Sequence, residues 1–488
     1  MATDGTNGTM PPKFSESSPV PLWLNGKQVT TSETFEVVSP LDCKVLYHAS
    51  SASEEDALAA VDAAQKAFPE WSKTKPSHRR DLFLRAARIF EERKDEFWHY
   101  CHTETASNEA YFAFDHSDAL EALKSTAGLI TTVDATMPTV GEEGRSAIIL
   151  HEPYGVVLSI APWNCPTILG LRAFLGPLAM GNTVVFKGSE YSPGAFWALA
   201  EVFHQAGLPA GALNTVYHRP ADAAKITSAL IAAPAIKKIN FTGSTAVGSV
   251  IASQAGKYLK PVLMELGGKA PAYVCEDADI NLAALQCALG AFMYSGQVCM
   301  STERILVHEK ILEEFKPALK AAIDQVFAEG APSELITAKP VERVKKLVDD
   351  ALSKGAKLVH GDPTEKPTVA TSMRPVVIED VREGMELYHT ESFGPTVALF
   401  VVKSDEEAIR IANDTEYGLA SAVFTEDLKR GLRIAKQIET GAVHINSMSI
   451  HDEPVLPHGG AKKSGFGRFN GREGLREWTR TKVVTWRD

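Results

Sequence analysis

The amino-acid sequence predicts an α/β protein with two parallel sheets. From residue 155 onward, short apolar segments rich in β-branched residues alternate with helical patterns. The apolar segments are GVVLSIA, NTVVFK, KKINF, PAYVC, RILVH, VALFVV and AVHIN; the helical ones include NLAALQCALGAF, LEEFKPALKAAIDQVF and DEEAIRIAND. Continuous apolar strands between helices are typical of parallel sheets covered on both faces. A chain of 488 residues is too long for one simple core, and two such sheets account for its length.

The part of the chain before residue 155 predicts a tail followed by helices. Residues 1–19 are polar and rich in Gly, Ser, Thr and Pro, so we expect a mobile tail. The stretch Ser53-Glu54-Glu55-Asp56 has the pattern of a capping box and opens the helical segment ALAAVDAAQKAF. Pro76 and Ser77 open a longer helical stretch that continues through RRDLFLRAARIFEERKDEF. Both segments are amphipathic and are expected to flank the sheets.

The charge balance favours a small-molecule partner. The chain has 50 basic and 61 acidic side chains, a formal net charge of −11, and no long basic run. This argues against a nucleic-acid partner and against a polybasic membrane contact. With 44% hydrophobic and 23% charged residues, the composition is that of an ordinary globular protein.

The cysteines indicate a reducing compartment. The six of them are scattered without CxxC spacing, which fits neither a disulfide framework nor a structural zinc site. The first residues lack a basic segment followed by an apolar one, and nothing later approaches an apolar span of about 18 residues. We therefore expect a cytoplasmic protein.

A glycine-containing turn after one predicted strand is a candidate anion seat. In KKINFTGSTAVGSVIASQAG, residues 237–256, a strand ends at Phe241 and a helix follows the turn Gly243-Ser244-Thr245. Free N–H groups and the positive end of a helix dipole attract a pyrophosphate at such a turn. The pattern is neither G-x-G-x-x-G nor a Walker loop, so an ordinary strand–turn–helix unit remains open.

Lys187 and Glu190 follow the predicted strand of NTVVFKGSEYSP. Open α/β sheets bind ligands beyond the carboxyl ends of their strands, where a carboxylate can accept both hydroxyls of an adenosine ribose. Glu190 would also repel a 2′-phosphate, which favours NAD over NADP. The alternative is a solvated Lys/Glu pair.

Three further residues could carry catalysis. Glu265, in LMELGGKAP, is an acid in an apolar setting beside two glycines, where desolvation raises a carboxyl pKa toward that of a useful base. Asn164, in SIAPWNCPTILG, follows a strand on a constrained loop and could be a fixed hydrogen-bond donor. Cys299, in FMYSGQVCMSTERI, could be a reactive thiol. Taken singly, each has an ordinary alternative: an exposed Glu, a turn Asn and a packed Cys.

These segments in this order resemble the aldehyde dehydrogenase superfamily from about residue 20 to the C-terminus. PWN, GNTVVFK with its Glu, FTGST, ELGGK, SGQVC, ESFGP and KKSGFGR all match. The segments APWNCPTILGLRA, GQVCMSTERI and HINSMSIHDEPVLPHGG are most similar to the salicylaldehyde, vanillin and benzaldehyde dehydrogenases.

The resemblance implies oxidation of an aldehyde, an aromatic one as in that subgroup, to a carboxylic acid. It makes Cys299 the nucleophile that forms a thiohemiacetal and then a thioester. Asn164 and the Cys299 backbone N–H would stabilise the oxyanion, and Glu265 would activate the hydrolytic water. An aliphatic aldehyde or semialdehyde remains the alternative substrate within the superfamily.

The resemblance also implies NAD as the cofactor, with NADP possible, and no metal. Lys187 and Glu190 would hold the adenosine ribose, while Glu391 and Phe393 of ESFGP would grip the nicotinamide ribose and flank its ring. Phe393 without the resemblance is an ordinary core aromatic. The turn facing the pyrophosphate would comprise Gly243, Ser244, Thr245, Ala246, Val247 and Gly248.

The implied fold has a Rossmann-like cofactor domain, a catalytic domain and a small oligomerisation arm. The cofactor domain would combine residues 20–134 and 152–264, and the catalytic domain would span 265–467. Residues 135–151 and 468–488 would form the arm and the C-terminal strand. Unpaired edge strands need a partner, so we expect a homodimer or homotetramer.

The substrate pocket is expected to be apolar with a few polar groups. Cys165 stands where the superfamily often has a large aromatic residue, which would leave room for a broader ring. Tyr294, Met300 and Ile450 are the other candidate pocket residues, and Tyr294 could equally be core.

Other chemistries fit the sequence less well. His444, His451 and His458 recur every seven residues, but the prolines around them indicate an irregular loop and not a zinc site. A thiol esterase would use a Cys, an oxyanion donor and a base but needs no nucleotide seat. A non-catalytic structural protein would not need Cys299, Glu265 and Asn164 together.

Overall fold

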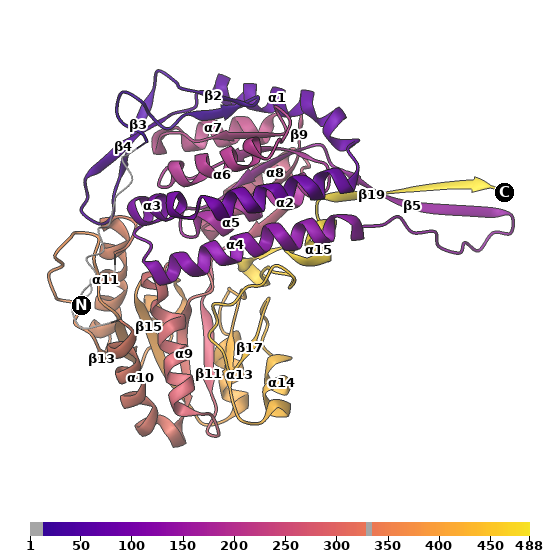
Figure 1. The fold of residues 1–488 in the computed structure, drawn as a ribbon. Helices are drawn as coiled ribbons and strands as arrows, with labels where there is room; N and C mark the ends of the chain where they lie inside the picture. Colours follow the sequence, from indigo (N-terminus) through magenta and orange to yellow (C-terminus); the bar gives the residue numbers. More distant parts are fainter. Residues whose placement is uncertain (1–12, 328–333) are drawn as a thin grey trace, which may run out of the picture.

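A computed structural model describes residues 13–327 and 334–488, and it confirms the α/β class with two parallel-sheet lobes (Figure 1). The first sheet has eight strands, parallel except at its edges. In spatial order they are β18 (Gly465–Phe466), β10 (Val262–Glu265), β9 (Ile236–Thr242), β6 (Val156–Ile160), β7 (Thr183–Lys187), β8 (Leu213–Val216), β1 (Leu22–Leu24) and β2 (Lys27–Val29). The chain leaves β6 toward β7 on one side and returns to β9 on the other. This reversal opens a ligand crevice beyond the carboxyl ends of β6 and β9.

Eight helices of the described chain, α1 to α8, pack around the first sheet. They are α1 (Glu54–Ser72), α2 (Pro76–Glu92), α3 (Lys94–Thr105), α4 (Glu109–Leu129), α5 (Pro166–Ala179), α6 (Pro193–Gln205), α7 (Ala223–Ala232) and α8 (Thr245–Lys257). The predicted capping box is present: Ser53 accepts from the Asp56 N–H, and Asp56 accepts from the Ser53 N–H. The long helix expected from Pro76 is divided at Arg93, whose guanidinium bonds Glu96 and Glu201 while its backbone leaves helical geometry.

The second sheet has seven strands and is covered on both faces. In spatial order they are β13 (Lys357–His360), β14 (Val376–Glu379), β15 (Thr396–Val402), β12 (Thr302–His308), β11 (Ala270–Val274), β16 (Ala422–Phe424) and β17 (His444–Ile445). Its helices are α9 (Ile280–Phe292), α10 (Leu312–Val326), α11 (Ala338–Ser353), α12 (Glu386–His389), α13 (Asp405–Asn413) and α14 (Leu428–Ala435). Along β12, Ile305 and Val307 pack in the core of α9 and α10, whereas Leu306 packs in the core of α11 and α13. This alternation explains the continuous apolar strands of the sequence.

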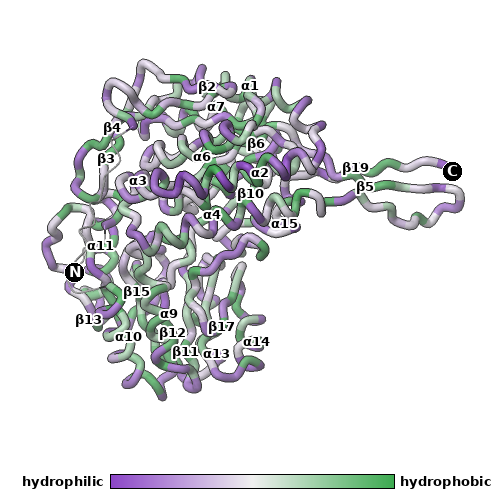
Figure 2. The backbone as a smooth tube through the Cα atoms, in the orientation of Figure 1, coloured by the Kyte–Doolittle hydropathy of each residue, from purple (hydrophilic) through white to green (hydrophobic). Residues whose placement is uncertain are grey.

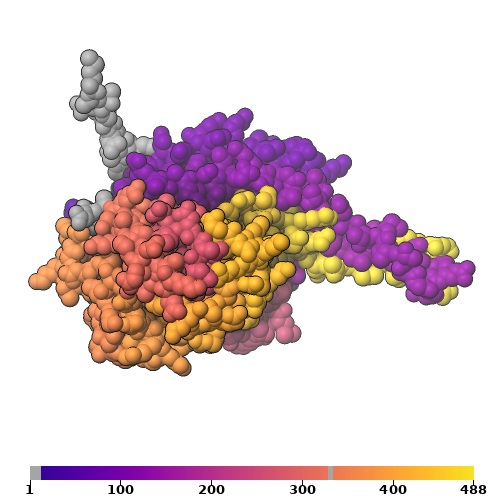
Figure 3. Space-filling view, turned by 90° about the horizontal axis from the view of Figure 1, so that it is seen from below, coloured from indigo at the N-terminus to yellow at the C-terminus, as the bar shows by residue number. Residues whose placement is uncertain are grey.

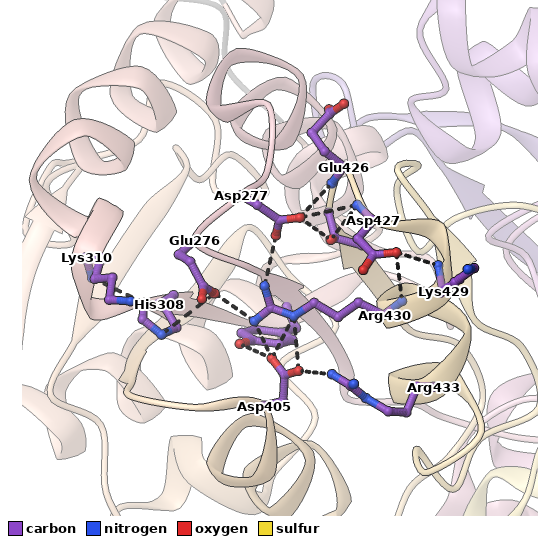
Figure 4. A network of polar contacts seen from close by, with 12 residues as sticks. Glu276, Asp277, His308, Lys310, Asp405, Glu426, Asp427, Lys429, Arg430 and Arg433 are labelled. Carbon is purple, nitrogen blue, oxygen red and sulfur yellow. Dashed lines mark hydrogen bonds and ion pairs between the residues drawn. The ribbon is translucent and has the colours of Figure 1, made fainter.

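A charged network fastens α13 and α14 to the end of β11 (Figure 4). The Arg430 guanidinium donates to Glu276 at 2.7 Å, to Asp277 at 3.0 Å and to Asp405 at 2.5 Å. Arg433 adds a second contact to Asp405 at 2.8 Å. One Arg therefore joins three acidic side chains from two segments, and the network stabilises the outer side of the second lobe.

A two-stranded ribbon projects from the body of the molecule (Figures 1 and 3). It pairs β5 (Arg145–Pro153) with β19 (Thr479–Arg487) in antiparallel register, from Thr479 opposite Pro153 to Arg487 opposite Arg145. Figure 2 shows that both strands carry hydrophobic stretches, and Val483 and Trp486 are 63% and 40% exposed. The two sequence segments predicted for the arm therefore pair with each other.

The C-terminal segment also completes the first lobe. Trp478, 1% exposed, packs so closely over Gly176 that a Cβ there would lie 2.2 Å from the indole nitrogen. Asn182 donates to the Trp478 carbonyl at 2.9 Å. The helix α15 (Gly471–Arg476) and the edge strand β18 complete this return of the chain.

The N-terminal part of the described chain packs against the first lobe. A hairpin of β3 (Thr34–Val38) and β4 (Val45–Ser50) lies near the N-terminal end of the described chain. Residues 1–12 of the expected tail lie outside the described residues, and Phe14 is buried against Tyr47 and Trp197. The domain boundaries stay a prediction. None of the described helices has the length and apolar character needed to cross a bilayer.

Candidate active site

Cys299 closely follows a strained turn between the two lobes. The turn Met293–Gly296 links α9 to the segment before β12, and Tyr294 and Ser295 have left-handed φ angles of 49° and 57°. Each such residue costs about 1–3 kcal/mol, so the surrounding structure must hold it. The Tyr294 hydroxyl donates to the Thr105 carbonyl at 2.5 Å, and Ser295 donates to the Glu334 carbonyl at 3.1 Å. The turn is thereby anchored to both lobes.

The Cys299 thiol is half-buried in a setting that keeps it protonated. Burial raises the pKa of the thiol well above its usual range, and the nearby Glu265 carboxylate raises it further. The positive charge of Arg172 acts in the opposite direction. A thiol in this setting would need a base close by to react as a nucleophile, and the Glu265 carboxylate is a close acidic neighbour.

Two glycines allow the chain to pass close to the reactive residues. A Cβ at Gly268 would lie 2.4 Å from the Cys299 carbonyl oxygen. A Cβ at Gly267 would lie 2.4 Å from a carboxylate oxygen of Glu391. The ELGG segment therefore needs both glycines for packing against the site.

Asn164 follows β6 on the loop before α5, and its side-chain amide donates to the Gln297 carbonyl at 2.9 Å. The loop is fixed from behind by two residues of α4. Tyr111 donates to the Asn164 carbonyl at 3.0 Å, and Asp115 accepts the Ile168 N–H at 2.9 Å. These bonds orient the amide toward the turn that carries Cys299.

Glu265 ends β10 and is 1% exposed. Its Oε1 atom has no hydrogen-bond partner among residues 13–327 and 334–488. The side chain of His458 is its near neighbour, with 3.6 Å between Nε2 and Oε1. A buried carboxylate with an unpartnered oxygen is suited to accept a proton.

One cavity of about 210 Å³ brings together the three predicted catalytic residues and four of the ten predicted cofactor residues. Its lining includes Pro162, Trp163, Asn164, Leu169, Thr242, Gly243, Ser244, Glu265, Gly267, Cys299, Arg343, Glu391 and Phe393. The three predicted catalytic residues thus share a cavity with part of the predicted nucleotide site.

The ESFGP loop is held in that cavity by a buried ion pair. Glu303, paired with Lys269 at 2.9 Å, accepts the backbone N–H groups of Ser392 and Phe393 at 2.8 and 3.1 Å. These bonds hold Phe393 at a left-handed φ of 44°. Burial, and then the charge of Glu303, raises the pKa of Glu391 to about 7. The glutamate predicted to meet a ribose is therefore fixed and weakly acidic.

The predicted cofactor residues that do not line the cavity lie on α8 and at or just after the end of β7. Ser244 caps α8, accepting the Val247 N–H at 3.4 Å, and Thr245 and Ala246 begin the helix. A Cβ at Gly248 would lie 2.4 Å from Leu266, so this glycine permits close helix–strand packing. Glu190 lines a separate cavity of about 360 Å³ with Tyr191. Burial lowers the pKa of Lys187, against the charge of Glu190.

The four predicted pocket residues are buried but do not line the 210 Å³ cavity. Tyr294 stacks on Tyr111 with 4.2 Å between ring centroids. The Cys165 sulfur lies 2.6 Å from the Tyr111 hydroxyl, while Met300 and Ile450 are 7% and 0% exposed. Within the described residues, no three His, Cys, Asp or Glu side chains are grouped to hold a metal.

Comparison with known proteins gives the family. The sequence model described as "Aldehyde dehydrogenase family" matches residues 27–484. The chain belongs to the aldehyde dehydrogenase family. It is an oxidoreductase that acts on aldehydes.

Relatives within the aldehyde dehydrogenases act on aromatic substrates by name. The chain is 41% identical to a vanillin dehydrogenase of Pseudomonas sp. (strain HR199 / DSM 7063), covering 96% of this chain and 97% of the relative. It is 39% identical to a salicylaldehyde dehydrogenase of Pseudomonas putida, covering 95% and 97%. The crystal structure of a salicylaldehyde dehydrogenase from Pseudomonas putida G7 complexed with salicylaldehyde matches with a TM-score of 0.92 and 37% identity, covering 96% and 98%.

The sequence predicts no catalytic role for three polar residues near this aldehyde dehydrogenase site. Arg343 lines the cavity and donates to the Ser392 carbonyl at 2.6 Å. Arg172, in the middle of α5, forms a buried ion pair with Asp452. His458 had been considered only as a metal ligand. A helix-interior Arg and a loop His carry no local signal, because only the fold brings them to Glu265 and Cys299.

Proposed function

We propose that this aldehyde dehydrogenase oxidises an aromatic aldehyde, of the salicylaldehyde, vanillin or benzaldehyde type, to the carboxylic acid with NAD. The observation that carries the proposal is the single cavity lined by Asn164, Glu265 and Cys299. The printed names of the relatives support the aromatic substrate.

The first chemical step is addition of Cys299 to the aldehyde. Glu265 takes the thiol proton as the sulfur bonds to the carbonyl carbon. This base is needed because the raised pKa of the thiol disfavours the nucleophilic thiolate. The developing oxyanion accepts hydrogen bonds from the Asn164 side chain and the Cys299 backbone N–H. The Asn164 amide is already held next to the turn through Gln297.

The last chemical step is hydrolysis of the acyl-Cys299 thioester. Glu265 removes a proton from water as the water oxygen bonds to the acyl carbon, and the C–S bond then breaks. The carboxylic acid leaves, and the departing Cys299 thiolate takes up a proton from solvent, which restores the thiol. Glu265 gives the thiol proton of the first step to solvent before hydrolysis, and because it lines the same cavity as Cys299, one carboxylate serves both steps.

The residues present fit a dinucleotide. The helix α8 begins at Thr245, directly after the cavity-lining Ser244, so its positive end lies at the cavity. Gly243 lets the backbone approach closely, since a Cβ there would lie 2.6 Å from the Phe241 ring. Glu190 would accept the adenosine ribose hydroxyls and disfavour a 2′-phosphate, with Lys187 beside it. When bound, NAD supplies the hydride acceptor for the oxidation, and Glu391 and Phe393 would hold its nicotinamide end.

The substrate ring would occupy the apolar side of the site. Trp163 and Leu169 line the cavity. We infer that the buried residues Cys165, Tyr294, Met300 and Ile450 form the apolar layer behind the wall that contacts the substrate ring. A smaller side chain at Cys165 leaves more space for an aryl group.

The assay for this proposal is NADH production from benzaldehyde, salicylaldehyde, vanillin and straight-chain aldehydes, each with NAD and with NADP. The expected result is a higher kcat/KM for the aryl aldehydes, with NAD preferred. A preference for straight-chain aldehydes would reject the aromatic substrate, and a preference for NADP would reject the role of Glu190.

Two variants test the catalytic roles. Cys299→Ala should abolish turnover, whereas Cys287→Ala, a buried cysteine of α9 remote from the chemistry, should leave it intact. Glu265→Gln should stop steady-state turnover. Unimpaired turnover by Cys299→Ala would reject Cys299 as the nucleophile, and unimpaired turnover by Glu265→Gln would reject Glu265 as the base.

We also infer a homodimer or homotetramer in a reducing, cytoplasmic compartment. The exposed apolar residues of β5 and β19 support a second copy as partner. All six cysteines lie in the described residues, and none forms a disulfide.

A further inference from the structure

His458 is a buried imidazole beside the proposed base. It lies between β17 and β18, and its backbone is fixed by two hydrogen bonds with Phe469, at 2.9 and 2.7 Å. Its Nε2 atom lies 3.6 Å from Glu265 Oε1, and its Nδ1 atom lies 3.9 Å from Asp452 Oδ1. The ring therefore stands between two carboxylates.

Neither of the two atoms that lie 3.6 Å apart, His458 Nε2 and Glu265 Oε1, has a hydrogen-bond partner in the described chain. Both atoms are buried. Buried polar atoms in native proteins are nearly always satisfied, and exceptions concentrate where chemistry needs them. Catalytic hydrogen bonds are often long before substrate binds and shorten in the working complex.

Burial favours the neutral form of the ring, and the charged groups around it orient it. The facing groups are Glu265 on β10, Arg172 on α5, and Asp452 and Arg468 on the flanking loops. Burial and then Arg172 lower the pKa of His458, against the effect of Glu265. Asp452 Oδ1, which also accepts from Asn470 at 2.9 Å, favours the tautomer with the proton on Nδ1. The lone pair of Nε2 then faces Glu265.

We propose that His458 accepts the proton that Glu265 collects from water during hydrolysis of acyl-Cys299. The O–H bond of the Glu265 carboxylic acid breaks, and an N–H bond forms at Nε2. The resulting imidazolium lies between the regenerated Glu265 carboxylate and Asp452, and it later releases its proton to solvent water. No electrons are transferred in this step. His458 acts through Glu265 and is thus a positioning and proton-relay residue, and the inference rests on the proposed function.

The direct test is His458→Phe, which keeps a flat ring and removes both nitrogens. Single-turnover NADH formation should stay within about twofold of wild type, because sulfur addition still has Glu265. Steady-state turnover should fall roughly 10²-fold, the usual share of one proton-transfer group. His204→Phe is the matched control: this histidine of α6 stacks on Trp23 and should tolerate the change. Wild-type steady-state turnover by His458→Phe would overturn the proposal.

A second variant separates proton transfer from simple hydrogen bonding. His458→Gln can donate to Glu265 but cannot take its proton, so it should remain as slow as His458→Phe. Full recovery by Gln would overturn the relay. The kcat of wild type should fall on the acid side, at a pH below the ordinary His range, as His458 becomes protonated. That limb should disappear in His458→Phe; its persistence would also contradict the relay.

An activated ester distinguishes failure of this inference from failure of the proposed function. p-Nitrophenyl acetate can acylate Cys299 without oxidation, so the burst and the later steady release of p-nitrophenolate report acylation and deacylation. We expect His458→Phe to keep the burst and lose the steady rate. Wild-type deacylation by the variant would refute the role of His458 while leaving aldehyde oxidation intact. Absence of NADH from every aldehyde, with the ester result as expected, would refute the proposed substrate alone.

Discussion

Replacing Gly268 by Ala should misplace the nucleophile without touching any reactive group. The new Cβ would lie 2.4 Å from the Cys299 carbonyl oxygen and 3.6 Å from Leu419. Ordinary contacts between non-bonded heavy atoms lie near 3.5–4.0 Å, so the two backbones must separate by roughly 1 Å. A carbonyl of the main chain cannot rotate away as the end of a long side chain can.

The expected effect of Gly268→Ala follows from that displacement. A shift of about 1 Å in a reacting group can cost about 10²-fold in rate, which corresponds to about 2.7 kcal/mol of activation free energy. Overpacking should also lower the free energy of unfolding by about 1–3 kcal/mol. The assay is the rate of single-turnover NADH formation, together with urea unfolding followed by circular dichroism.

Gly128→Ala is the matched control for this prediction. Gly128 lies in α4, and a Cβ there has no neighbour within 4 Å among the described atoms outside its own turn of helix. It should leave the rate unchanged and stabilise the helix by about 0.5–1 kcal/mol. If Gly268→Ala forms NADH in a single turnover as fast as Gly128→Ala, the idea that ELGG sets the position of Cys299 is wrong.

Three other perturbations have defined outcomes. Arg172→Met should lower the free energy of unfolding by about 3–5 kcal/mol, because Asp452 is left buried without its cation; a loss below about 1 kcal/mol in urea unfolding would contradict a structural role for the pair. Glu391 has a pKa of about 7 in the folded chain against an ordinary 4.5, so the folded state binds more protons between these values and loses stability as pH rises through them. Glu391→Gln should remove the contribution of this carboxyl group to the pH dependence of the free energy of unfolding, measured by urea unfolding between about pH 5 and about pH 8. An unchanged pH dependence would contradict the raised pKa of Glu391. Trp486→Glu should convert the proposed oligomer to a smaller species in sedimentation velocity, because it adds charge to an exposed apolar strand; an unchanged sedimentation coefficient would count against the arm as an interface.

The fold class and the candidate catalytic residues could be predicted from local sequence because their signals are short-range. The strands after residue 155 are buried on both faces and read as continuous apolar runs, and β12 shows the reason in its alternation between two cores. Asn164, Glu265 and Cys299 each follow a strand end or a glycine pair whose pattern is visible in a few residues. Their meeting in one cavity could be inferred only from the order of the motifs.

The supporting residues could not be predicted because their roles depend on long-range packing. Tyr111 and Asp115 look like ordinary helix residues, yet they fix a loop more than fifty residues later in the chain. His458 meets Glu265 through the pairing of β18 with β10. The break at Arg93 is another long-range effect, since its guanidinium bonds Glu201 on α6.

The return of the C-terminal segment to the first lobe has a consequence for how the chain folds during synthesis. The first sheet lacks β18, and the space over Gly176 lacks Trp478, until the end of the chain has emerged. At about 5–20 residues per second, the segment from the end of β10 to the C-terminus takes roughly 10–45 s to make. During that time the edge of β10 and the whole of β5 are unpaired templates for other nascent chains. We therefore expect the ribosome-bound intermediate to be prone to aggregation, and removal of the last dozen residues should leave β5 unpaired and the space over Gly176 unfilled in the finished chain.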